Sequence, residues 1–204
     1  MLTSTTSEWP HQDQPIRTAG APLDDARAAL LLIHGRGATA ESMLALADEL
    51  DLPDVALIAP QAANRTWYPY SFMAPIQQNE PNLTSALRLV KELVEQVMER
   101  GFSTEQIALL GFSQGACLAT EFATRHSHRY GGVFGLSGGL IGPEGTPFDY
   151  DGSMDGTPVF LGCSDRDPHI PQSRVDETAE VFRTLGADVT KRIYEGMGHT
   201  VNRD

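Results

Sequence analysis

The chain has 204 residues, 41% of them hydrophobic, which predicts one globular domain over residues 1–204. Its 27 acidic residues outnumber 15 basic ones, and the resulting net charge of −12 argues against a nucleic-acid partner, whose phosphates require a basic patch. The polar opening segment has no apolar stretch, and no later run approaches the roughly eighteen apolar residues of a membrane helix, so we expect a cytoplasmic protein without a membrane span.

Short apolar runs alternate with longer amphipathic segments along the chain. The predicted strands cover residues 28–34, 55–60, 107–112, 131–137 and 158–163, and a further strand-like run covers residues 187–196. The predicted helices cover residues 41–50, 85–100, 114–126 and 173–186. This alternation predicts an α/β fold with a mostly parallel sheet and helices on both faces, in which ligands bind beyond the carboxyl ends of the strands.

The segment Gly-Phe-Ser-Gln-Gly at residues 111–115 lies between a predicted strand and a predicted helix. This is the context of a nucleophile elbow, a tight turn that exposes a serine hydroxyl. Gly111 and Gly115 leave room where side chains would collide, and Ser113 is the candidate nucleophile. A G-x-S-x-G match alone more often belongs to an ordinary loop serine, but the strand and helix around it favour the elbow.

A serine nucleophile requires a nearby base, and that base requires an orienting acid. Asp165 and Asp167 follow the predicted strand at 158–163, and His199 follows the last strand-like run. The order serine, acid, histidine is the one expected for a nucleophile elbow in this kind of sheet. His169 is the alternative to His199, and both aspartates stay open at this point.

The predicted strand at residues 28–34 runs into the sequence His-Gly-Arg-Gly. The loop after this strand and the residue after the nucleophile each supply one backbone N–H to an oxyanion hole, so the amides of Arg36 and Gln114 are the candidates. A flexible glycine turn is the alternative interpretation of this loop. His34 precedes the serine in the chain, and we expect it to order the loop rather than act as a base.

These motifs resemble the phospholipase/carboxylesterase family of α/β-hydrolases, which includes small bacterial carboxylesterases and acyl-protein thioesterases. The matching stretches are residues 31–42, 59–68, 111–116, 167–171 and 194–199. The resemblance implies the α/β-hydrolase fold and a serine hydrolase that cleaves small carboxylic esters with short to medium acyl chains, through an acyl-enzyme and with neither cofactor nor metal. It also implies Ser113 as nucleophile, His199 as base and Asp167 as acid, because the family's acid precedes a Pro-x-Val/Ile-Pro sequence. An acyl-thioesterase or lysophospholipase is the alternative, and a non-catalytic receptor for a small ligand is disfavoured. We expect a monomer or a homodimer.

Two features depart from the family pattern. Arg36 occupies a position that is usually apolar, where its cation would either favour an anionic substrate or be solvated or paired with a carboxylate. The segment at residues 67–81 is rich in aromatic side chains, and we expect it to cover the site. Its residues Trp67, Tyr68, Phe72 and Met73 are predicted to line the acyl pocket, or alternatively to form a small satellite core.

Overall fold

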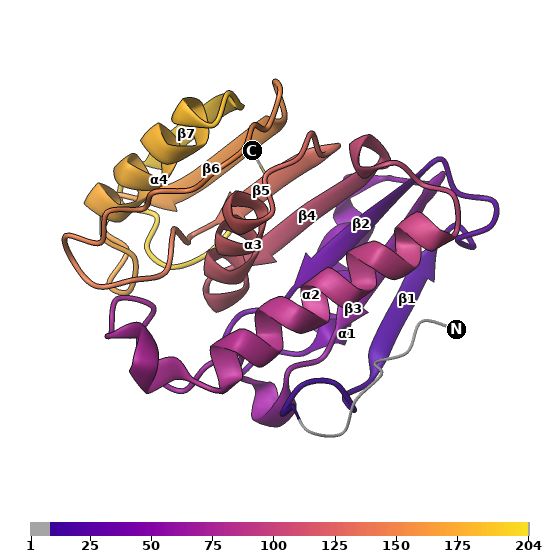
Figure 1. Ribbon diagram of the computed structural model, residues 1–204, viewed down its shortest axis with the longest axis horizontal. Helices are drawn as coiled ribbons and strands as arrows, with labels where there is room; N and C mark the ends of the chain where they lie inside the picture. The colour runs from indigo at the N-terminus through magenta and orange to yellow at the C-terminus, as the bar shows by residue number, and fades with distance from the viewer. Residues whose placement is uncertain (1–8, 204) are drawn as a thin grey trace.

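The computed structural model describes residues 9–203 and contains one seven-stranded sheet in that range. The strands lie in the order β1-β3-β2-β4-β5-β6-β7 (Figure 1). Their bounds are β1 Ile16–Gly20, β2 Ala28–Ile33, β3 Val55–Pro60, β4 Ile107–Phe112, β5 Gly132–Leu136, β6 Pro158–Ser164 and β7 Asp188–Tyr194. Neighbouring strands are parallel except at one edge, where β1 runs antiparallel to β3.

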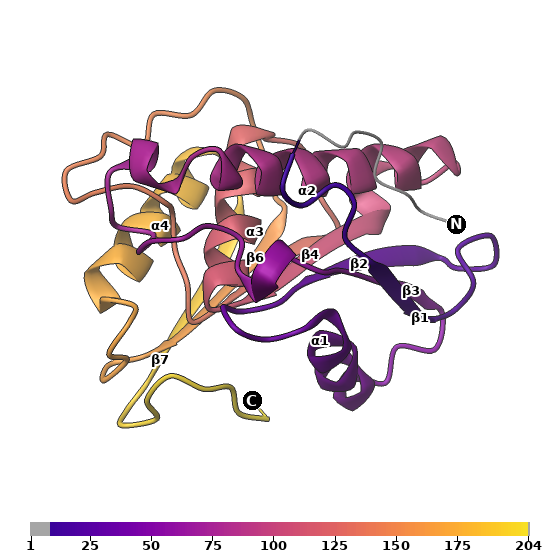
Figure 2. The same cartoon turned by 90° about the horizontal axis from the view of Figure 1, so that it is seen from below.

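Helices cover both faces of the sheet, as the sequence predicts. Their bounds are α1 Ala40–Ala47, α2 Asn82–Glu99, α3 Gln114–Arg125 and α4 Gln172–Thr184. Figure 2 shows α2, α3 and α4 on one face and α1 on the other. None of these helices within residues 9–203 has the length and apolar character needed to cross a bilayer.

The continuous apolar character of the central strands follows from burial on both faces. In β2, Leu31 and Ile33 belong to the core under α2 and α3, whereas Leu30 and Leu32 belong to the core beside α1. Successive side chains of a strand point to opposite faces, so a strand covered on both sides must be apolar at every position. This explains why these strands are recognisable in the sequence.

The edge of the sheet and the helix ends differ from the sequence prediction. Strand β1 was not expected, because its residues are mostly exposed or half-buried and it forms no apolar run. Helix α1 ends at Ala47 and continues as a short 3-10 turn over Asp48–Leu50, and α2 begins three residues earlier than predicted. These differences lie at a sheet edge and at helix ends, where hydrophobic periodicity carries little information.

The strand order determines where a ligand binds. The chain places β3 on one side of β2 and then crosses to place β4 on the other side. The loops that follow β2 and β4 therefore leave the sheet in different directions and open a crevice between them. Arg36 lies in the loop after β2, and Ser113 lies in the turn after β4.

Candidate active site

Ser113 lies in a strained turn between β4 and α3. Its φ of 56° and ψ of −120° are rare for a residue with a side chain, and its N–H donates to the carbonyl oxygen of Leu136 at 2.9 Å. A Cβ at Gly111 would lie 2.2 Å from the carbonyl oxygen of Gly115, and a Cβ at Gly115 would lie 2.0 Å from that of Ile33. Both glycines are therefore required, for the steric reason that the sequence suggests.

Three side chains from distant parts of the chain meet beside this turn. His199 Nε2 lies 2.8 Å from Ser113 Oγ, and His199 Nδ1 lies 2.7 Å from Asp167 Oδ2. A carboxylate accepts only, so Nδ1 carries the proton and Nε2 presents its lone pair to the serine hydroxyl. This tautomer is the one that a general base for Ser113 needs.

Asp167 is the carboxylate that contacts His199. Its side chain is fully buried, and Oδ1 accepts hydrogen bonds from the backbone N–H groups of His169 at 2.9 Å and Ile170 at 3.0 Å. Burial alone would raise the pKa of this carboxyl, but the hydrogen bonds from His199 and from the two backbone N–H groups outweigh burial and lower it. Asp167 is therefore held in its ionised form.

The alternative acid, Asp165, has a different position. Its Oδ1 accepts from the N–H of Gly196 at 2.7 Å, while Ser164 Oγ accepts from the N–H of Gly198 at 3.0 Å. These two bonds attach the loop that carries His199 to the end of β6. Asp165 thus supports the histidine loop and does not contact the imidazole ring.

The imidazole ring of His199 lies between two other rings. The Phe112 ring lies 5.1 Å away, centroid to centroid, and the His169 ring lies 4.9 Å away at an interplanar angle of 79°. His169, the alternative base in the sequence, is exposed and contacts Asp167 through its backbone only. The structure therefore brings His199, and not His169, to the serine.

The loop after β2 approaches Ser113 closely. A Cβ at Gly35 would lie 3.2 Å from the Cβ of Ser113, and Arg36 lines the same cavity as the serine. Gln114 is the first residue of α3, where a backbone N–H has no partner within the helix. The two backbone segments expected to form an oxyanion hole therefore flank Ser113.

His34 orders the loop after β2 from a fully buried position. Its Nδ1 donates to the carbonyl oxygen of Gly35 at 2.7 Å, and its Nε2 accepts from the N–H of Ala62 at 3.0 Å. Burial lowers the pKa of His34 below its ordinary value of 6.5 and so favours the neutral ring. Only the neutral ring can accept at Nε2.

The neutral state of His34 predicts a loss of stability in mild acid. In the unfolded chain the imidazole protonates near pH 6.5, whereas the folded state resists protonation. The free energy of unfolding is therefore highest above pH 6.5 and falls as the pH drops through 6.5 toward the lower folded pKa. Urea unfolding at pH 7.5 and pH 5.5 measures this fall.

Two variants isolate the contribution of His34 to this pH dependence. His34→Asn removes the titrating group, so the difference in unfolding free energy between the two pH values should become smaller. His128→Asn removes an exposed histidine and should keep the wild-type difference. An unchanged pH dependence in His34→Asn would contradict the assignment.

The backbone of residues 65–70 forms hydrogen bonds with the side chains of Arg36 and Gln114, the two residues of the predicted oxyanion hole. These contacts were not predicted from the sequence. Gln114 Oε1 accepts from the N–H of Trp67 at 2.8 Å, and Gln114 Nε2 donates to the carbonyl oxygen of Tyr68 at 2.7 Å. Arg36 Nη1 donates to Pro69 O at 2.9 Å, and Nη2 donates to Tyr70 O at 2.6 Å. We call residues 65–70 the bracing segment.

His11 is a further residue that the sequence analysis placed only in a polar segment. It is fully buried; Nε2 donates to the carbonyl oxygen of Trp67 at 3.0 Å, and Nδ1 accepts from the N–H of Ala63 at 3.1 Å. It therefore holds Trp67 of the bracing segment through a further hydrogen bond. No local pattern around residue 11 indicates this contact, because its partners lie more than fifty positions away.

A cavity of about 430 Å³ opens beside Ser113 and His199. Of the four predicted pocket residues, Tyr68 and Phe72 line it, whereas Trp67 and Met73 do not. The Trp67 indole is fully buried and donates to the carbonyl oxygen of His34 at 2.8 Å, and Met73 packs against the main core. Trp67 and Met73 therefore belong to the main core, and neither the pocket prediction nor the satellite-core alternative describes their positions.

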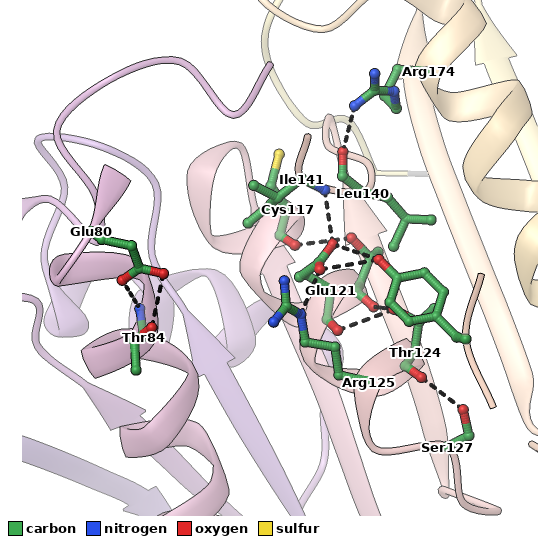
Figure 3. A network of polar contacts seen from close by, with 12 residues as sticks. Glu80, Thr84, Cys117, Glu121, Thr124, Arg125, Ser127, Leu140, Ile141 and Arg174 are labelled. Atoms are coloured by element: carbon green, nitrogen blue, oxygen red, sulfur yellow. Dashed lines mark hydrogen bonds and ion pairs between the residues drawn. The ribbon is translucent and has the colours of Figure 1, made fainter. Parts of the chain in front are cut away.

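Buried charges support the wall of this cavity at Phe72. The Glu121 carboxylate accepts from the N–H of Ile141 at 2.9 Å, and Arg174 donates to the carbonyl oxygen of Gly142 at 2.7 Å. Figure 3 shows Glu121 facing Ile141 within a polar network on α3. The N–H of Gly142 in turn donates to the carbonyl oxygen of Phe72 at 2.8 Å. Charges removed from water are thus hydrogen-bonded, and they fix the loop behind the cavity.

A serine, a histidine and an aspartate that are linked by hydrogen bonds at the carboxyl edge of a parallel sheet define a serine hydrolase of the α/β-hydrolase fold. The sequence model of the phospholipase/carboxylesterase family matches residues 17–204. The chain therefore belongs to this family, and it is an ester hydrolase.

Individual relatives agree with this assignment. The crystal structure of a phospholipase/carboxylesterase from Dyadobacter fermentans is 44% identical, with a TM-score of 0.91 over 97% of this chain and 94% of that one. Acyl-protein thioesterase 1 of Kluyveromyces lactis is 26% identical over 87% of this chain and 86% of its own length. Acyl-protein thioesterase 1 of Gibberella zeae is 34% identical over a segment that covers 53% of this chain and 47% of the thioesterase.

Proposed function

We propose that Ser113 is the nucleophile of this ester hydrolase, with His199 as its general base and Asp167 as the acid that orients His199. The observation that carries the proposal is a pair of hydrogen bonds that link the three side chains. His199 Nε2 lies 2.8 Å from Ser113 Oγ, and His199 Nδ1 lies 2.7 Å from Asp167 Oδ2. A serine hydroxyl is a weak nucleophile at neutral pH, and a base in this position removes its proton during attack.

The reaction begins when Ser113 Oγ bonds to the carbonyl carbon of the ester and its proton passes to His199 Nε2. The carbonyl oxygen becomes an oxyanion, which the backbone amides of Arg36 and Gln114 stabilise in our proposal. Each such donor contributes roughly a hundredfold to a thousandfold in rate. Asp167 keeps the imidazole in position and stabilises its protonated form.

The tetrahedral intermediate then collapses to an acyl-enzyme, and water hydrolyses the acyl-enzyme in a second stage. The bond between the carbonyl carbon and the alcohol oxygen breaks, and His199 donates its proton to the departing alcohol, which leaves an acyl group on Ser113. A water molecule that transfers its proton to His199 then attacks this acyl-enzyme. The carboxylic acid leaves, and the Ser113 hydroxyl is regenerated.

The proposed substrates are carboxylic esters with short to medium acyl chains. A cavity of about 430 Å³ lies toward the small end of the range of roughly 300–1,000 Å³ that is usual for ligand sites. Tyr68, Phe72 and Ile170 supply apolar lining for an acyl chain. We also propose a cytoplasmic protein that is a monomer or a homodimer.

A thioesterase activity is the second candidate, because two of the relatives are acyl-protein thioesterases. The same nucleophile and oxyanion donors serve a thioester carbonyl equally well, so the site geometry does not distinguish the two bonds. Oxygen esters and thioesters of equal acyl length, compared by kcat/KM, discriminate between the two activities.

The first experiment is hydrolysis of p-nitrophenyl esters from acetate to palmitate. We expect kcat/KM to be highest for a short or medium chain and to fall sharply toward palmitate, because a long chain exceeds the cavity. A steady rise of kcat/KM up to palmitate would contradict the proposed chain length. Absence of cleavage across the whole series would contradict the proposed use of these esters.

A further inference from the structure

The charge on the lining of the cavity is opposite in sign to that of the protein. The chain carries a net charge of −12, yet no aspartate or glutamate is found among the described residues that line the cavity. Arg36 is the lining residue with a permanent charge, and His169 and His199 are the titratable imidazoles beside it. The Asp167 carboxylate lies behind His199, with its oxygens facing that ring and two backbone N–H groups.

Arg36 differs from most arginines of this chain in its partners. Eight arginines form ion pairs with a carboxylate, namely Arg17, Arg88, Arg100, Arg125, Arg129, Arg174, Arg183 and Arg203. The Arg36 guanidinium instead donates to the hydroxyl of Thr66 at 3.0 Å and to the backbone carbonyls of Pro69 and Tyr70. These neutral acceptors orient the guanidinium but do not neutralise its charge.

The sequence alternatives for a structural arginine describe this side chain only in part. Arg36 is exposed, as the solvated alternative expects, but three hydrogen bonds to acceptors other than carboxylates fix its guanidinium. A guanidinium has five N–H donors, so three bonds do not exhaust it. Its planar fork matches the geometry of a carboxylate, and fixing the fork in advance reduces the entropy lost on binding.

We propose that the preferred ester carries a second, anionic group, a carboxylate, which Arg36 binds at the cavity while Ser113 attacks the ester carbonyl. This inference rests on the proposed function and specifies the substrate class of the same site. The carboxylate belongs either to the acyl part or to the alcohol part of the ester. Both sources offer the same group to Arg36, and the experiment separates them.

The test compares matched pairs of charged and neutral esters. In the acyl arm, mono-p-nitrophenyl succinate is compared with p-nitrophenyl butyrate. In the alcohol arm, 4-(butyryloxy)benzoate is compared with its methyl ester. The measured quantity in each arm is the ratio of kcat/KM for the anionic ester to that for the neutral ester. The arm in which this ratio depends on the Arg36 side chain identifies the part of the substrate that Arg36 binds.

The expected result is a ratio that depends on the Arg36 side chain. Arg36→Gln keeps the backbone amide and a donor for the bracing segment but removes the charge, and it should lower the ratio about tenfold in one arm. Arg36→Lys should retain part of the ratio, because the charge remains while the fork is lost. Raising the salt concentration should lower the wild-type ratio as the charge is screened.

Arg27→Gln is the matched control. It removes the same unit of charge at the opposite end of β2, so it should leave the ratio unchanged. If Arg36→Gln lowered kcat/KM equally for the charged and the neutral esters, the inference would be overturned, since Arg36 would then only hold the bracing segment. An unaltered ratio in both arms would overturn it as well. If the wild-type protein cleaved neither ester of a pair, the proposed function itself would be contradicted. That result differs from a ratio that does not depend on Arg36, which contradicts only the further inference.

Discussion

Ser113→Ala lowers kcat for ester hydrolysis by about a millionfold, if the three polar side chains act as a unit. The substitution removes the atom that forms the acyl-enzyme and leaves only the catalysis that substrate binding and the oxyanion amides provide. The variant should stay folded, because the lost hydrogen bond to His199 contributes only about 1 kcal/mol to the free energy of unfolding. Steady-state hydrolysis of a p-nitrophenyl ester and urea unfolding measure the two quantities.

Ser137 offers a control with the same local chemistry. It is a serine with a positive φ of 52° that directly follows the neighbouring strand β5, and it is buried away from the cavity lining. Ser137→Ala should retain kcat within a few-fold of wild type. If Ser113→Ala retained substantial hydrolysis, or if both variants lost it equally, Ser113 would not be the nucleophile.

Asp167→Asn should lower kcat by about ten thousandfold, the size of the effect known when such an acid becomes an amide in other triads. The two Asp167 oxygens accept on separate sides, one from the N–H groups of His169 and Ile170 and the other from His199. An amide keeps its oxygen toward the backbone N–H groups and turns its NH₂ toward His199. That ring must then accept at Nδ1, which places its proton on Nε2 and prevents it from taking the proton of Ser113.

The matched variant is Asp165→Asn. Asp165 Oδ1 accepts from the N–H of Gly196, and an amide oxygen can accept in the same place, so kcat should fall by no more than about tenfold. A larger loss in Asp165→Asn than in Asp167→Asn would transfer the role of the acid to Asp165. The comparison therefore decides between the two carboxylates that the sequence leaves open.

The parts of the site that the sequence predicts are those fixed by local sterics and strand order. The turn at Ser113 tolerates only glycine at positions 111 and 115, and a five-residue sequence motif is enough to identify this requirement. His199 follows a strand and comes after the serine in the chain, so its place at the carboxyl edge follows from the parallel sheet. The central strands were recognised for a similar reason, since each is apolar on both faces.

The parts that the sequence does not predict depend on contacts between distant segments. Arg36 bonds residues about thirty positions away, and Gln114 and His11 bond partners about fifty positions away. Trp67 was expected in the pocket because it is aromatic and near the site, but its indole N–H has a buried acceptor, the carbonyl of His34. Strand β1 was missed because an exposed edge strand has no continuous apolar pattern.

The bracing segment limits how this enzyme can change. A loop that lines a binding cavity is ordinarily the part of an α/β protein that is freest to vary, because it can be altered without disturbing the scaffold. Here the same residues contribute Tyr68 to the cavity and receive hydrogen bonds from Arg36 and Gln114, whose amides flank the serine. Under the proposed mechanism, selectivity and turnover are coupled through one stretch of backbone, so we expect variation that reshapes the proposed acyl pocket here also to displace the proposed oxyanion donors.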